Sequence, residues 1–88
     1  MKVVVVTRDN TDYARTVTDY LRDFKMQTGR DLTTLDPDSL EGADLCRTYD
    51  IVQYPTIIAL SDDGVMQNLW AGLPLPTMSE VSYYVQTI

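Results

Sequence analysis

The sequence predicts a single α/β domain with the element order β-α-β-α-β-β-α and a mixed four-stranded sheet. The run Val3–Val6 shows no alternation of apolar and polar residues, which is typical of a strand covered on both faces. Residues 13–24 repeat apolar positions with helical spacing. Pro55 stands directly before a β-branched run that ends at a turn containing Gly64, the pattern of a β-hairpin. We expect two helices on one face of the sheet and one on the other.

Length and charge limit the classes of function. With 88 residues, the chain is long enough for one domain, 1–88, with one modest core. Thirteen acidic residues against seven basic ones give a formal charge of −6, which repels a phosphate backbone. We therefore expect no nucleic-acid partner.

The N-terminal apolar run and the cysteine content indicate a cytoplasmic protein without a metal. Four valines after Lys2 are far fewer than a signal peptide or the ~20 residues of a membrane span require. We expect no membrane association. Cys46 is the sole cysteine and the chain has no histidine, so neither an intrachain disulfide nor a usual zinc site is predicted. No cofactor is expected.

The first half reads as strand, helix, strand. Asn10 or Thr11 is expected to cap the first helix, and Gly29 to end it in a left-handed conformation. Its apolar stripe consists of Tyr13, Ala14, Val17, Tyr20, Leu21 and Phe24. The strand 32–35 follows, and a strand-helix-strand of this length predicts a parallel pair.

The start of the second helix has two interpretations. Asp36 caps a helix with Pro37 in the first position, or Ser39 caps one that begins at Leu40. The helix extends to residue 49. Gly42 is expected to weaken it by up to ~1 kcal/mol relative to alanine.

The second half reads as a hairpin followed by a helix. Its strands are expected at 56–60 and 65–70, with Gly64 at positive φ. Thr77 and Glu80 have the spacing of a capping box that starts the last helix. The stripe of that helix is Val81, Tyr84, Val85 and Ile88.

The segments Tyr49–Ile51, Pro55–Thr56 and Trp70–Gly72, with the turn at Gly64, resemble the C-terminal half of the thioredoxin and glutaredoxin family. The resemblance implies a sheet order of 2-1-3-4, with the third strand antiparallel to the first. It also implies a cis bond before Pro55. In this family the residue before that proline, here Tyr54, offers its backbone to an extended peptide or to glutathione.

The chain differs from the family at the positions of the catalytic motif. The resemblance aligns the C-P-Y-C motif with Thr11, Asp12, Tyr13 and Ala14, so both sulfurs are absent. Dithiol exchange requires a thiolate and a resolving thiol. A hydroxyl nucleophile at Thr11 would need a base, and no histidine exists to supply one. We predict no catalytic residue and interpret Thr11 as a helix cap.

These observations favour a redox-inactive domain that binds a protein or extended peptide, or serves as an assembly subunit. The predicted binding residues are Thr11, Tyr13, Tyr54 and Pro55, and Trp70 either joins this groove or packs in the core. The sequence does not indicate an oligomeric state.

Two alternatives involve other ligands. Cys46 could support a thiol-dependent activity, although its place on an apolar helix stripe favours a small buried side chain. A third hypothesis is that the chain binds a glutathione-like small molecule without catalysis. The apolar segment 73–76, where the family usually has a basic group and a polar pair, counts against it.

Overall fold

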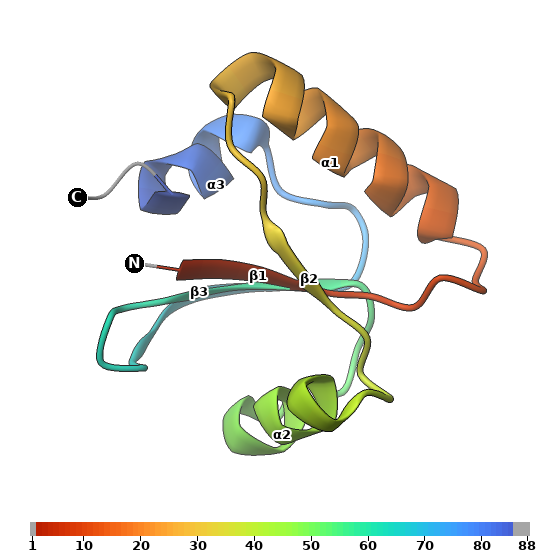
Figure 1. Cartoon of the computed structure of the whole chain (residues 1–88), viewed down its shortest axis with the longest axis vertical. Coiled ribbons are helices and arrows are strands. Elements are labelled where there is room, and N and C mark those ends of the chain that lie inside the picture. The colour runs from red at the N-terminus through yellow and green to blue at the C-terminus, as the bar shows by residue number, and fades with distance from the viewer. Residues whose placement is uncertain (1, 86–88) are drawn as a thin grey trace.

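The computed structural model describes residues 2–85 and contains the seven predicted elements in the predicted order (Figure 1). The strands are β1 (Lys2–Val6), β2 (Thr33–Leu35), β3 (Thr56–Leu60) and β4 (Met66–Ala71). The helices are α1 (Ala14–Thr28), α2 (Leu40–Tyr49) and α3 (Met78–Val85). No helix within residues 2–85 is long and apolar enough to cross a membrane.

The four strands form one mixed sheet in the order β2-β1-β3-β4, as expected. β1 runs parallel to β2 and antiparallel to β3, and β3 continues into β4 as an antiparallel hairpin. The prediction that Val3–Val6 lies mid-sheet is confirmed. All four valines are buried, because successive side chains point into the cores on the two faces.

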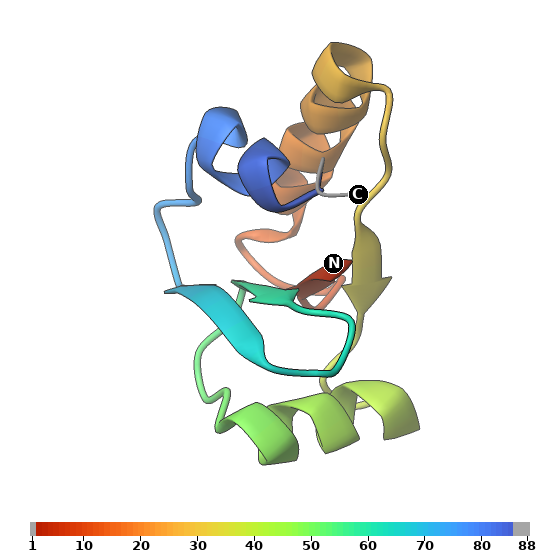
Figure 2. The same ribbon diagram turned by 90° about the vertical axis from the view of Figure 1, so that its left-hand side faces the viewer.

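The sheet separates two hydrophobic cores, and the helices lie in layers on its two faces (Figure 2). Helices α1 and α3 cover one face, where Val17, Phe24 and Val81 pack on alternate residues of β1 and β3. Helix α2 covers the other face through Leu45, Cys46 and Tyr49, which are partly buried. The prediction of two helices on one face and one on the other is therefore confirmed.

The turn glycines lie as the sequence predicts. Gly29 ends α1 at φ 74°, and its amide donates to the carbonyl of Lys25 at 2.8 Å. Gly64 has φ 85° in the hairpin turn. Two strand boundaries differ slightly, since β2 begins at Thr33 and β4 spans Met66–Ala71.

The two later helices begin with side-chain caps. The Ser39 hydroxyl accepts from the Gly42 amide at 3.0 Å, which selects the second of the two predicted starts for α2. Thr77 and Glu80 form the predicted capping box of α3, with the Thr77 amide donating to Glu80 Oε1 at 3.1 Å and the Glu80 amide donating to Thr77 Oγ1 at 3.2 Å. Ile88, expected on the stripe of α3, lies outside the described residues.

Gly42 has a role that helix propensity does not reveal. A Cβ atom at this position would lie 1.8 Å from the carbonyl oxygen of Asp36. The chain before α2 therefore crosses so close to the helix that only glycine fits. Glycine is a poor helix former, but at this position we expect it to give a more stable domain than alanine, because any side chain would clash with the Asp36 carbonyl.

Candidate functional site

The candidate site lies at the end of the sheet where β1 finishes and β3 begins. Because these strands are antiparallel and Val6 pairs with Thr56, the segment after β1 and the segment before β3 meet there (Figure 1). The first segment carries Thr11 and Tyr13, and the second carries Tyr54 and Pro55.

The second segment is fixed by hydrogen bonds on both sides of Tyr54. The Tyr54–Pro55 peptide bond is cis. Pro55 is buried, and its carbonyl accepts from the Gly72 amide at 2.8 Å. The Thr56 hydroxyl donates to the Gln53 carbonyl at 2.6 Å. Among the backbone hydrogen bonds that loops form within residues 2–85, none uses the amide or carbonyl of Tyr54.

Arg8 organises the site, although the sequence did not identify it as a site residue. Its guanidinium carbon lies 4.8 Å from the centroid of the Tyr54 ring, within the range of a cation–π contact. Its Nε and Nη2 atoms each donate to a carboxylate oxygen of Asp38 at 3.1 Å. The hydrogen bonds with Arg8 lower the pKa of Asp38, and those with Asp38 raise the pKa of Arg8. The signal in the sequence was a cationic residue placed two positions after the central strand, but its acidic partner, Asp38, lies on a loop far away in the chain.

The Tyr54 hydroxyl reaches towards α2. It lies 3.9 Å from Cys46 Sγ and 3.5 Å from the Ile51 carbonyl, so its single proton can serve one acceptor at a time. Burial raises the pKa of Tyr54, and the neighbouring Cys46 adds to this shift while Arg8 opposes it.

Cys46 is less buried than its place on the helix stripe predicts. Its side chain packs at the margin of the core under α2, and the residue remains partly exposed. The expectation of a small buried side chain was wrong, because Cys46 is only partly buried, with its Sγ 3.9 Å from the Tyr54 hydroxyl.

The expected cap of α1 by Asn10 or Thr11 was also wrong. A turn precedes the helix, so that Tyr13 becomes the N-cap residue and makes no side-chain cap. The Thr11 hydroxyl donates to the Arg8 carbonyl at 3.2 Å, and the Thr11 carbonyl accepts from the Ala14 amide at 3.3 Å. The first turn of α1 therefore keeps amides without a side-chain acceptor.

The aromatic residues of the predicted groove lie towards different faces of the sheet. Tyr13 and Trp70 pack against the core under α1 and α3, whereas Tyr54 packs against the core under α2. Trp70 makes an edge contact with Tyr84, with ring centroids 5.6 Å apart, which favours the packing role for this residue. Arg8, on the first segment, interacts electrostatically with both Tyr13 and Tyr54.

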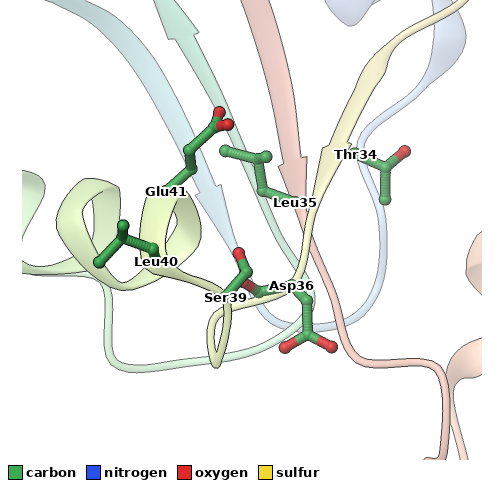
Figure 3. A pocket seen from close by; sticks show the side chains of 6 residues that line it. All are labelled: Thr34, Leu35, Asp36, Ser39, Leu40 and Glu41. Atoms are coloured by element: carbon green, nitrogen blue, oxygen red, sulfur yellow. The ribbon is translucent and has the colours of Figure 1, made fainter.

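Another hollow on the described surface lies beside β2 and the start of α2. It has a volume of about 430 Å³ and is lined by Thr34, Leu35, Asp36, Ser39, Leu40 and Glu41 (Figure 3). Its polar groups already serve the helix start, because Asp36 Oδ1 accepts from the Asp38 amide and the Ser39 hydroxyl caps α2. No cluster of three or more metal-binding side chains occurs in residues 2–85. We therefore place the candidate site at Tyr54 and not here.

Comparisons with known proteins support the fold. The chain is similar to the structure of thioredoxin 1 from Thermosipho africanus TCF52B, with a TM-score of 0.65 and 16% identity over 98% of this chain and 91% of that one. A structure described as a malarial protein has a TM-score of 0.64 and 14% identity, covering 96% of this chain and 91% of that chain. No family model and no curated protein sequence matches. The chain has a thioredoxin-like fold.

Proposed function

We propose that this chain is a redox-inactive thioredoxin-like domain that binds an extended protein segment at the Tyr54–Pro55 loop. The observation that carries the proposal is the backbone of Tyr54, whose amide and carbonyl take part in no loop hydrogen bond within residues 2–85. A donor and an acceptor on one residue are what an added strand pairs with.

The absence of paired sulfurs supports the redox-inactive part of the proposal. The resemblance to the family puts the segment Thr11–Ala14 at the position of the C-x-x-C motif, and this segment contains no cysteine. Cys46 is the sole thiol and belongs to α2. Dithiol exchange has no resolving partner here.

The start of α1 supports an interaction with a carboxylate of the partner. Tyr13 caps the helix without a side-chain acceptor, and the first turn contains no acidic residue. Free amides and the positive end of the helix dipole favour a negative group at this position. A partner segment with an acidic residue or a C-terminal carboxylate would satisfy them.

A peptide selected by phage display on the immobilised domain tests this function. On titration into the ¹⁵N-labelled protein, we expect the largest shifts at the Tyr54 amide and at the amides of Arg15 and Thr16. Tyr13→Ala should weaken binding, and Pro55→Ala should do so more strongly while circular dichroism shows a folded domain. Arg22→Ala, on the exposed face of α1, is the matched control. Shifts confined to α3, or to the Arg22 face, would refute the proposed site.

A second candidate function uses Cys46 as a reactive thiol. The observation that favours it is the Tyr54 hydroxyl 3.9 Å from Cys46 Sγ, in a residue that is partly exposed. Disulfide reduction above the level of a Cys46→Ala variant would support this function and contradict the redox-inactive one. Equal, background-level reduction by both proteins is the result we expect.

A further inference from the structure

A second surface feature lies between the edge strand β4 and helix α3. Asn68, Trp70, Glu80, Tyr83 and Tyr84 line a hollow of about 250 Å³. The strand contributes alternate residues, which point to the same face, and the helix contributes residues at i, i+3 and i+4. The two periodicities thus bring three aromatic rings and one carboxylate together.

The three rings form walls at different angles. Tyr84 lies between the other two, with its ring 5.6 Å from Trp70 at an interplanar angle of 72° and 5.0 Å from Tyr83 at 86°. Rings that cross at such angles cannot stack into one layer. Each pair is an edge-to-face contact, and all three rings line the hollow at steep angles to one another.

Hydrogen bonds hold one of these walls, the Tyr84 ring, in place. The Asn68 side-chain amide donates to the Tyr84 hydroxyl at 3.2 Å, and the Asn68 side-chain carbonyl accepts from the Leu69 amide at 2.8 Å. The Tyr84 ring is therefore positioned before any ligand arrives, which reduces the ordering cost of binding.

The carboxylate of Glu80 is also held in place. Its Oε1 accepts from the Thr77 amide and the Thr77 hydroxyl at 3.1 and 3.0 Å. These hydrogen bonds lower the pKa of Glu80, so the group is ionised at neutral pH. A hydrogen bond from the Trp70 side chain also contributes to the lowered pKa, so the Glu80 carboxylate is oriented beside the ring of Trp70, where a cation in the hollow can pair with it.

We propose that this hollow binds the guanidinium group of an arginine side chain from a partner protein. A planar cation can stack on a ring face and pair with a carboxylate at the same time, and arginine does both better than lysine. The formal charge of −6 favours a cationic partner. The volume of about 250 Å³ lies below the range of drug-sized ligand sites and suits a single side chain. This inference is independent of binding at Tyr54.

Trp70 is the only tryptophan of the chain and reports on the hollow directly by its fluorescence. We expect Nα-acetyl-arginine methylamide to change this fluorescence saturably. The citrulline analogue has nearly the same shape without the charge and should bind at least severalfold more weakly. Absence of saturation, or equal binding of the two compounds, would overturn the proposal. Binding of tetramethylammonium as strong as that of the arginine compound would overturn the assignment to guanidinium.

Two variants separate binding from folding. Glu80→Gln removes the charge and keeps an acceptor for the capping box, so the helix should persist while affinity falls by roughly two- to fivefold. Tyr83→Leu removes one wall from a residue that is 73% exposed, with a similar loss expected. Glu41→Gln, on α2 far from this hollow, is the matched control and should leave affinity unchanged. Unaltered affinity in both hollow variants would contradict the site.

Discussion

The guanidinium of Arg8 lies over the ring of Tyr54, 4.8 Å from its centroid, and joins the loop after β1 to the loop before β3. The same guanidinium pairs with Asp38, on the segment that leads into α2. One side chain therefore connects three segments around the candidate binding loop. We infer that Arg8 serves the site by positioning the Tyr54 ring. Its positive charge is already balanced by the Asp38 carboxylate and is not left for a ligand.

Replacing Arg8 should change the titration of Asp38. The hydrogen bonds from Arg8 lower the pKa of Asp38, so Arg8→Gln should return this pKa towards the ordinary value of 3.8. A carboxylate whose pKa is lower in the folded than in the unfolded protein stabilises the fold at pH values above its unfolded-state pKa. This contribution is lost as the pH falls through its folded-state pKa. Carboxyl ¹³C shifts measured against pH check the change, with Arg47→Gln as the control. An unchanged Asp38 titration would show that the ion pair does not persist in solution.

Much of the fold could be predicted because local patterns and burial agree in this sequence. The unbroken valine run placed β1 in the middle of the sheet, and the helical spacing from residue 13 to residue 24 identified the buried face of α1. The capping box at Thr77 fixed the start of α3. These features depend on residues close together in the chain, which a sequence displays directly.

The details that were missed depend on contacts between distant segments. Nothing near Arg8 indicates that Asp38 will pair with it, and nothing in α2 indicates that the Asp36 carbonyl crosses Gly42. Thr11 looked like a helix cap, but its hydroxyl finds the Arg8 carbonyl within a turn. The hollow at Trp70 likewise requires a strand and a helix to meet.

Substitution of Gly42 distinguishes local propensity from tertiary packing. Propensity alone predicts that alanine stabilises α2 by up to ~1 kcal/mol. Because the new Cβ would lie 1.8 Å from the Asp36 carbonyl oxygen, we expect Gly42→Ala to destabilise the domain by about 1–3 kcal/mol in urea denaturation. Thr48→Ala, exposed on the same helix, should be neutral or stabilising by a few tenths of a kcal/mol. A more stable Gly42→Ala protein would show that the chain before α2 moves easily away.

Removal of the Tyr20 hydroxyl should change stability at alkaline pH. Burial raises the pKa of Tyr20 to about 12, and this hydroxyl has no hydrogen-bond partner among residues 2–85. In the unfolded chain the Tyr20 hydroxyl ionises nearer pH 10. The contribution of this raised pKa to the free energy of unfolding is therefore intact below pH 10 and is lost as pH rises towards 12. Tyr20→Phe should unfold less readily than the parent between these values.

At neutral pH the stability of Tyr20→Phe should be unchanged or higher by up to about 1 kcal/mol, since the substitution removes a buried hydroxyl that has no hydrogen-bond partner among residues 2–85. Denaturant titrations at pH 7 and at pH 11 provide the comparison. A clear loss at pH 7 would mean that the hydroxyl has a partner that stabilises the fold.

The reactivity of Cys46 should depend on the Tyr54 ring more than on its hydroxyl. The thiol is partly exposed and the ring packs against the same core, so the ring limits the approach of a thiol reagent. The hydroxyl contact of 3.9 Å is weak and competes with the Ile51 carbonyl. We expect Tyr54→Phe to alter the reaction rate by no more than about twofold, Tyr54→Ala to raise it severalfold, and unfolding in urea to raise it further. A fluorogenic maleimide followed by stopped flow measures all four states. If Tyr54→Phe changed the rate as much as Tyr54→Ala, the hydroxyl would determine the reactivity of the Cys46 thiol. That result would favour the thiol-dependent function over the redox-inactive one.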